Sequence, residues 1–220
     1  MDSDGTRAVA PEIRSPDDGK TPWVLNLGTR EIFSLGPYSD HDSQRARTLL
    51  GSMVKEYKYD PISLKRQLAI EKRVLARAIT LMRKIWPDQP FDFCVPVPSN
   101  RRNGPSLATE FSAKLSSLYP RIKDGRSALQ KNREISSLKS VPKKERPRHL
   151  KDAYTFAPAV AASRGILIVD DIYDTGATLS EANRAIENCS VSMFAQLPRY
   201  FIVLSHLESN KRWKKWPGHS

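Results

Sequence analysis

Hydrophobic residues in the first half of the chain recur at helical spacing. Between Asp42 and Tyr57 apolar side chains return every three or four positions with polar residues between them, which predicts an amphipathic helix. A longer helix is predicted from Leu64 to Ile85, where Pro87 closes it. A third is predicted from Pro105 to Leu118. The basic residues of these segments fit the solvated sides of the helices.

Shorter apolar segments have the composition of strands. The segment Phe91–Val97 alternates apolar residues and is bounded by prolines, whereas Ile166–Val169 is continuously apolar. A last strand is predicted from Tyr200 to Leu204, and Trp23–Leu27 fits an edge strand. A helix predicted from about Leu179 to Asn188 follows Ile166–Val169. This alternation predicts an α/β fold with a mainly parallel sheet flanked by helices.

The two ends of the chain and one central segment lack steady periodicity. A length of 220 residues fits one α/β domain and not two. Residues 1–37 are therefore predicted to form a partly flexible extension, residues 38–208 the domain, and residues 209–220 a basic tail. The segment Arg121–Lys151 is predicted to be rich in loops.

Positive charge is concentrated in two of these segments. The formal net charge of the chain is +12, and Arg121–Lys151 carries eleven Lys and Arg against three Asp and Glu. The tail from Lys211 to Ser220 adds four basic residues, interleaved with tryptophans that would stack on nucleic-acid bases. A phosphate-rich partner is expected. The central segment is interpreted either as a lid over an anionic substrate, as a nucleic-acid surface, or as a solvated loop.

Several classes of protein are disfavoured by the sequence. No apolar run approaches the ~20 residues of a membrane span, and the N-terminal residues are acidic without the apolar core of a secretory signal, so a cytoplasmic location is expected. Cys94 and Cys189 form no pair typical of a disulfide framework or a zinc site. The four histidines have no metal-ligand spacing.

The chemistry most strongly indicated lies after Ile166–Val169. Asp170 and Asp171 are expected at the carboxyl end of this strand, where open parallel sheets bind ligands. Adjacent carboxylates suit a vicinal diol such as the 2- and 3-hydroxyls of a ribose. The turn Asp174–Thr178 opens a helix with small residues and hydroxyls, which suits a phosphate. The stretch predicts a ribose 5-phosphate site, the alternative being that the aspartates only end a strand and cap a helix.

The thirteen residues "ILIVDDIYDTGAT" resemble the phosphoribosylpyrophosphate (PRPP) motif of type I phosphoribosyltransferases. Three further segments are similar to the ComF family: "YSDHDSQRARTLLGSMVKEYKYDP", "VPVPSNRRNGPSLATEFSAKL" and "ERPRHLKDAYTF". The similarity covers about Tyr38 to His206. The chain departs from that family in lacking an N-terminal zinc ribbon, in having His149 and Leu150 where Asn-Val is usual, and in having Tyr173 where a small aliphatic residue is usual.

The resemblance implies a Mg²⁺-dependent transfer of ribose 5-phosphate from PRPP to a nitrogenous base, with release of pyrophosphate. Asp170 and Asp171 would hold the ribose hydroxyls, directly or through Mg²⁺. The 5-phosphate would be held by the turn, whose residues are Asp174, Thr175, Gly176, Ala177 and Thr178. The pyrophosphate would meet the loop that contains Ser99, Asn100, Arg101, Arg102 and Asn103. In this interpretation Arg101 or Arg102 stabilises the leaving charge.

Two questions stay open at this level. Asp174 is a candidate proton acceptor for the incoming base, and capping of the next helix is its alternative role. The same resemblance also allows a non-catalytic module that senses PRPP or a nucleotide and binds nucleic acid through segment 121–151 and tail 211–220, because ComF-like proteins are associated with DNA uptake. Either function is compatible with a homodimer.

Overall fold

The computed structural model describes residues 23–27, 30–39, 47–99, 104–135, 138–207 and 213–215. Within these ranges the main sheet has seven strands in the order β4-β3-β7-β8-β2-β1-β9, and β5 and β6 form a separate hairpin. The strands are β1 Trp23–Leu27, β2 Arg30–Ser34, β3 Phe93–Pro96, β4 Lys123–Asp124, β5 Leu129–Lys131, β6 Tyr154–Phe156, β7 Ile166–Tyr173, β8 Arg199–His206 and β9 Lys214–Lys215. The helices are α1 Leu49–Tyr59, α2 Leu64–Ile85, α3 Leu107–Leu118, α4 Arg146–Leu150, α5 Ala177–Glu187 and α6 Ser192–Gln196, with a 3₁₀ turn, η1, at Leu138–Ser140.

The main sheet is mostly parallel. Strands β4, β3, β7, β8 and β2 pair in parallel, whereas β1 is antiparallel to β2 and β9 is antiparallel to β1. Parallel neighbours require crossover connections, which the helices supply. The predicted α/β class with a mainly parallel sheet flanked by helices is therefore confirmed.

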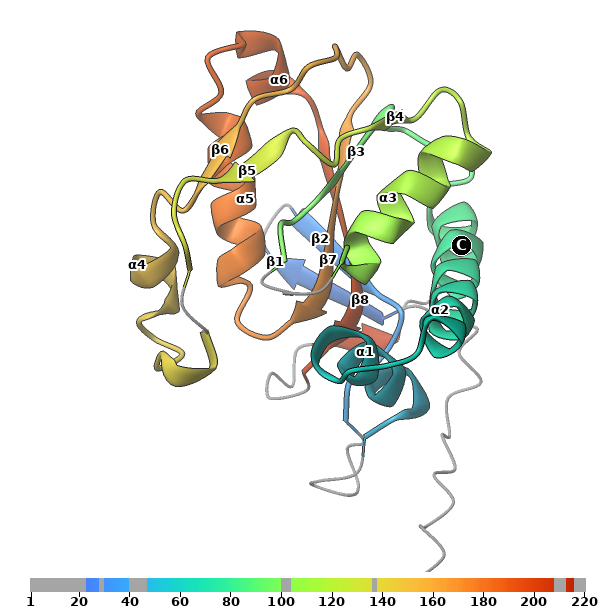
Figure 1. Ribbon diagram of the computed structural model, residues 1–220. Helices are drawn as coiled ribbons and strands as arrows, with labels where there is room; N and C mark the ends of the chain where they lie inside the picture. The colour runs from blue at the N-terminus through green and yellow to red at the C-terminus, as the bar shows by residue number, and fades with distance from the viewer. Residues whose placement is uncertain are drawn as a thin grey trace, which may run out of the picture.

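Helices cover both faces of this sheet. Figure 1 shows α2 and α3 on one side of the strands and α5 and α6 on the other. The central strand β7 serves both layers, because Leu167 and Val169 pack with α1, α2 and α3 while Ile166 and Ile168 pack with α5. Burial on both faces explains why this strand is continuously apolar rather than alternating.

Helices α1, α2 and α3 begin at polar caps. Helix α1 starts after Thr48, whose hydroxyl accepts a hydrogen bond from the Gly51 amide at 2.9 Å. The predicted start at Asp42 lies outside the described residues, but Arg47 and Thr48, which the prediction included, are not helical. Helix α2 follows Ser63 and spans the predicted range, and α3 follows Ser106, whose hydroxyl accepts from the Thr109 amide. Such caps satisfy amides that have no partner inside the helix.

Residues outside the predicted domain contribute to the sheet. Strands β1 and β2 both come from the segment assigned to the N-terminal extension, and β1 lies between β2 and β9. In the tail, Trp213 is buried and its ring stacks on His206 at 4.2 Å between centroids. Trp213 is therefore engaged in packing, not in a position to stack on nucleic-acid bases. No helix in the described ranges combines the length and the apolar composition needed to cross a membrane.

Candidate functional site

A cleft of about 1910 Å³ opens at the carboxyl ends of β3 and β7. This volume exceeds the roughly 300–1,000 Å³ typical of small-molecule sites, so the cleft has room for more than one small molecule. The sequence-predicted residues that line the cleft are Ser99, Asp170, Asp174, Thr175, Gly176 and Thr178. Asp171 and Ala177 do not line it. Residues Asn100, Arg101, Arg102 and Asn103 lie outside the described residues, so their predicted roles remain predictions.

Strand β7 does not end at the aspartate pair, and the prediction that it does is wrong. It continues to Tyr173 because β8 is long enough to pair with it through His206. The other neighbour, β3, ends earlier, and its last pair joins Pro96 to Val169. Asp170 therefore follows the last residue shared with β3, which places it at the cleft although the strand continues.

Asp170 combines burial with access to the cleft. Its side chain accepts a hydrogen bond from the Asp171 amide at 2.8 Å, and the residue is only 9% exposed. Burial raises the pKa of Asp170 to about 7; the nearby Lys58 ammonium opposes this shift and the Asp171 charge adds to it. A proton donor or a cation from a ligand would favour its ionised form.

The Asp171 carboxylate makes structural contacts within the fold. One carboxylate oxygen accepts the Ala108 amide hydrogen at 2.8 Å, at the start of α3, and the other lies 3.6 Å from the Lys58 Nζ atom. The side chain is 4% exposed. A carboxylate at a helix N-terminus is favourable because amides there lack partners. Asp171 thus ties α3 and α1 to β7, a role that the sequence did not indicate.

The turn after β7 requires its glycine. Gly176 has a φ of 78° and precedes α5, which begins at Ala177, two residues before the predicted start. A Cβ atom at this position would lie 2.6 Å from the Tyr173 hydroxyl. Tyr173 is itself fixed, because its ring packs edge-on against Trp213 at 5.3 Å. Thr175, Gly176 and Thr178 line the cleft, so the N-terminus of α5 lies at it.

Asp174 is bound to the basic segment. The Lys143 ammonium donates to its Oδ1 atom at 2.7 Å, and the Arg146 guanidinium donates to its Oδ2 atom. Burial alone would raise the pKa of Asp174, but the hydrogen bonds from Lys143 and Arg146 outweigh it and lower the pKa. Asp174 is therefore held ionised, and each carboxylate oxygen has a cationic partner.

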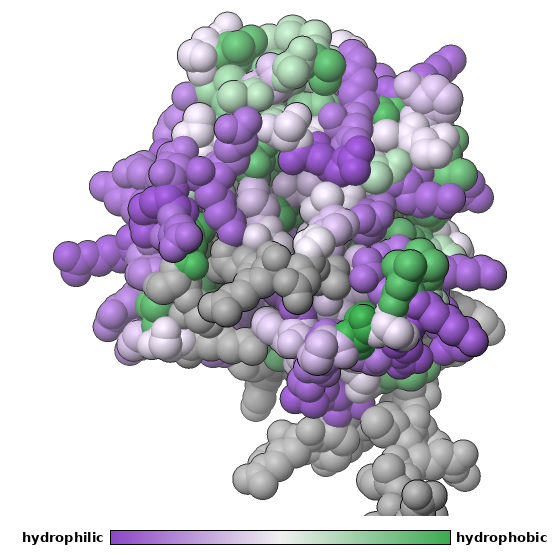
Figure 2. Space-filling view, in the orientation of Figure 1, coloured by the Kyte–Doolittle hydropathy of each residue, from purple (hydrophilic) through white to green (hydrophobic). Residues whose placement is uncertain are grey.

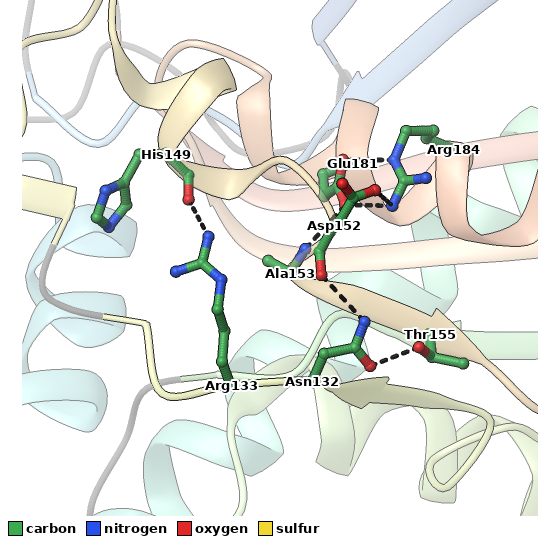
Figure 3. A network of polar contacts seen from close by, with 8 residues as sticks. All are labelled: Asn132, Arg133, His149, Asp152, Ala153, Thr155, Glu181 and Arg184. Carbon is green, nitrogen blue, oxygen red and sulfur yellow. Dashed lines mark hydrogen bonds and ion pairs between the residues drawn. The ribbon is translucent and has the colours of Figure 1, made fainter.

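The described residues 132–135 and 138–153, which carry these cations, we call the cover. At its base the Asn132 amide donates to the Ala153 carbonyl at 3.0 Å, and the Asn132 side chain donates to the Asp152 carbonyl (Figure 3). The same base is joined to α5, where Glu181 accepts the Ala153 amide hydrogen and Arg184 ion-pairs with Asp152. Hydrogen bonds at both ends of the cover and the contacts of Lys143 and Arg146 with Asp174 hold the cover at the cleft.

Much of the basic charge of this region is used inside the fold. Besides Lys143 and Arg146, Arg133 donates to the His149 carbonyl, as Figure 3 shows, and Lys131 donates to the Ser99 carbonyl at 2.8 Å. Exposed basic residues remain on the segment, namely Arg121, Lys144, Arg148 and Lys151. Hydrophilic side chains predominate on the left of Figure 2, the side on which Figure 1 places α4. The lid interpretation accounts for the inward-facing cations and leaves the exposed ones unexplained.

The described side chains do not form a metal site by themselves. Within the described residues no group of three or more His, Cys, Asp or Glu side chains is arranged to hold a metal ion. Asp170 supplies one carboxylate at the cleft, whereas Asp171 is occupied by Ala108 and Lys58. Mg²⁺ usually combines one or two carboxylates with substrate phosphates and water. The residues fit a Mg²⁺ ion that is carried mainly by a phosphorylated ligand.

Two cleft lysines were missed as site residues, Lys58 from α1 and Lys131 from β5. Lys58 lies in the last turn of a helix, a position whose orientation toward the cleft depends on how that helix packs.

No family model matches this chain, and a search of the curated proteins finds no match. The functional interpretation therefore rests on the geometry of the cleft and on the motif that borders it.

Proposed function

We propose that this protein is a phosphoribosyltransferase that binds PRPP and moves its ribose 5-phosphate to a nitrogenous base. One observation carries the proposal: Asp170 and the turn Asp174–Thr178 border a single cleft at the carboxyl ends of parallel strands. A carboxylate accepts hydrogen bonds from a ribose diol, and amides at a helix N-terminus bind a phosphate. We accordingly assign the α/β domain to the type I phosphoribosyltransferase-like folds.

In this proposal the protein orients two substrates and needs no covalent nucleophile. A bond forms between a nitrogen of the base and the anomeric carbon while the bond from that carbon to the pyrophosphate oxygen breaks, through a state with oxocarbenium character. Asp170 would hold the ribose hydroxyls and so fix the anomeric carbon. Mg²⁺, held by Asp170 and the oxygens of PRPP, would neutralise part of the charge on the leaving pyrophosphate.

Asp174 would accept the proton that the base loses, provided that the cover releases it. Asp174 is ionised, as a proton acceptor must be, but its lowered pKa makes it a weak base, and Lys143 and Arg146 occupy both oxygens. That observation favours a second candidate, a module that binds PRPP or a nucleotide and does not turn it over. The two candidates share the ligand and differ in whether pyrophosphate is released.

Calorimetry and a pyrophosphate-release assay test these proposals together. We expect the protein to bind PRPP in the presence of Mg²⁺ and to release pyrophosphate with at least one member of a panel of free bases. Binding without release for every base would favour the sensing module. Absence of PRPP binding would remove both candidates.

Asp170→Asn is the informative variant, because the Asp171 carboxylate also holds α3 and its loss would disturb the fold. We expect Asp170→Asn to weaken PRPP binding at least tenfold, since a charge-assisted hydrogen bond contributes about 1.5–3 kcal/mol. Asp88→Asn is the matched control, because Asp88 is exposed on a turn outside the cleft. Equal PRPP affinity in both variants would contradict the assignment of Asp170 to the ribose.

A further inference from the structure

A second groove, which we call the α2–α3 groove, lies between these two helices. It has a volume of about 700 Å³, and none of the residues that line it also lines the cleft. Hydrophobic side chains reach the surface on the right of Figure 2, the side on which Figure 1 places α2 and α3. The groove therefore belongs to the helical layer of the fold and is separate from the candidate substrate site.

The interior of the α2–α3 groove is apolar. Leu75 and Ile79 of α2 are nearly buried and form its floor, whereas Leu68 and Leu118 border it with 54% and 43% of their surface exposed. Large apolar side chains that share one surface patch mark an interaction site more often than they occur by chance. From Leu68 to Ile79, α2 rises about 16 Å, the length of about three helical turns. The groove thus has the length and the lining to hold a short helix.

Each of the two helices brings an exposed lysine to the groove. Within the described part of the chain, Lys72 of α2 and Lys114 of α3 make no hydrogen bond or ion pair. The acidic residues of the groove serve the fold instead. Glu71 accepts a hydrogen bond from the Tyr57 hydroxyl at 2.7 Å, and Glu110 lies in the first turn of α3, where a carboxylate is favourable. The groove therefore presents apolar surface flanked by two positive charges that the described fold does not neutralise.

We propose that the α2–α3 groove binds an amphipathic helix of a partner protein that carries acidic residues beside its apolar stripe. Apolar side chains spaced i, i+3, i+4 and i+7 on that helix would pack between Leu68 and Leu118, and its carboxylates would pair with Lys72 and Lys114. A second copy of this chain is a poorer match, because it brings the same lysines and the net charge of each chain is +12. A nucleic-acid backbone would leave the leucines uncovered. The inference does not depend on the proposed function.

Fluorescence anisotropy with labelled synthetic peptides tests this inference on the full chain. The acidic probe is a peptide of about 18 residues, long enough to form a helix, with one stripe of leucines flanked by glutamates. A second peptide has lysines in place of the glutamates, and a third is a scrambled form of the acidic probe. We expect the acidic probe to bind with micromolar affinity and the other two peptides to bind about tenfold more weakly or worse.

Charge reversal tests the contribution of the lysines. The variant with Lys72→Glu and Lys114→Glu should lose about tenfold or more in affinity for the acidic probe and gain affinity for the lysine peptide, an exchange that damage to the fold would not produce. The control variant carries Lys84→Glu and Lys144→Glu, two exposed positions outside the groove. Its affinity for the acidic probe should stay within about twofold of the wild type, because salt screens distant charges.

A second variant tests the apolar lining. Leu68→Gln combined with Leu118→Gln should weaken binding of the acidic probe about tenfold or more, because both side chains are exposed and free to contact a partner. Equal binding of the scrambled peptide would overturn the inference, since general attraction to a basic protein would then explain the affinity. No binding at about 1 mM acidic probe would overturn it as well.

Two further measurements address other occupants of the groove. Sedimentation equilibrium of the protein alone would overturn the inference in favour of a second copy if it showed a dimer that the leucine variant dissociates. Competition by a single-stranded oligonucleotide, with an affinity that falls on reversal of Lys72 and Lys114 but not in the leucine variant, would assign the lysines to nucleic acid. A monomer whose bound acidic probe resists the oligonucleotide would support the acidic helix.

Discussion

Arg146 of the cover ion-pairs with Asp174 in the turn after β7, although 28 positions separate the two residues in the sequence. Lys143 binds the other oxygen of the same carboxylate at 2.7 Å. The predicted proton acceptor is therefore also the contact that closes the cover over the cleft. A base nitrogen that approaches Asp174 would compete with two cations, which couples acceptor binding to movement of the cover.

The cover should open when Asp174 loses its charge. We predict that Asp174→Asn increases the rate of tryptic cleavage between Leu138 and Leu150 about five- to tenfold, since losing two partly buried ion pairs costs the closed state about 1 kcal/mol or more. Limited proteolysis followed by mass spectrometry measures the rate and the site. Glu145→Gln is the control, because Glu145 is an exposed carboxylate in the same segment. Equal cleavage rates in both variants would show that Asp174 does not hold the cover.

Gly176 should be required for packing before any ligand binds. We predict that Gly176→Ala lowers the free energy of unfolding by about 1–3 kcal/mol, because a left-handed backbone and the Tyr173 hydroxyl both oppose a Cβ atom. Urea unfolding measures the change. Adding Tyr173→Phe removes the hydroxyl, so the glycine substitution should cost less in that background. An equal cost with and without the hydroxyl would assign the whole effect to the backbone conformation.

Local patterns were sufficient to predict the parallel sheet and the strand, turn and helix around Asp170. Contacts between distant segments were not predictable in this way. The Asp171 carboxylate reaches the Ala108 amide across 63 positions, and nothing in the neighbouring residues distinguishes this aspartate from Asp170. Helix α5 begins earlier than expected because its cap is the left-handed Gly176, which has no side-chain hydrogen bond to signal a start. Tertiary packing thus decided which of two adjacent carboxylates meets the cleft.

The buried Asp170 carboxyl should make stability depend on pH in the metal-free protein. Its folded pKa of about 7 lies above the ordinary value of 3.8, so between these values the folded state holds a proton that the unfolded state releases. The contribution of Asp170 to stability is therefore greatest below about pH 4 and declines as the pH rises to about 7.

Asp170→Asn removes this dependence. We expect the unfolding free energy of the wild type, measured relative to that of the variant, to fall by about 1 kcal/mol for each unit of increase in pH across this window. Urea unfolding at pH 5 and pH 8 without Mg²⁺ measures it, with Asp88→Asn as the exposed control. A difference that is independent of pH would mean that the folded pKa of Asp170 is close to its ordinary value.

The remaining prediction concerns the exposed cations that the cleft does not use. Lys143 is bound to Asp174, whereas the adjacent Lys144 and the nearby Arg148 are exposed, as are Lys214 and Lys215 of β9. If these residues contact a nucleic-acid backbone, each neutralised phosphate releases counterions. The logarithm of affinity should then fall linearly with the logarithm of salt concentration, with a slope of about −0.7 to −0.9 per contacted phosphate.

We predict salt-sensitive, sequence-indifferent binding to single-stranded DNA or RNA, weakened by charge reversal at Lys144 and Arg148. These substitutions are cleaner than removal of residues 211–220, because Trp213 packs on His206 and Tyr173. Fluorescence anisotropy at low and physiological salt measures binding, and PRPP affinity of the same variants should stay unchanged because neither side chain lines the cleft. No binding by the wild type at low salt would leave the cover with a role at the cleft alone. Nucleic-acid binding that survives both charge reversals would assign the contact to Lys214 and Lys215. Charge reversal at these two lysines should then weaken binding in the same assay.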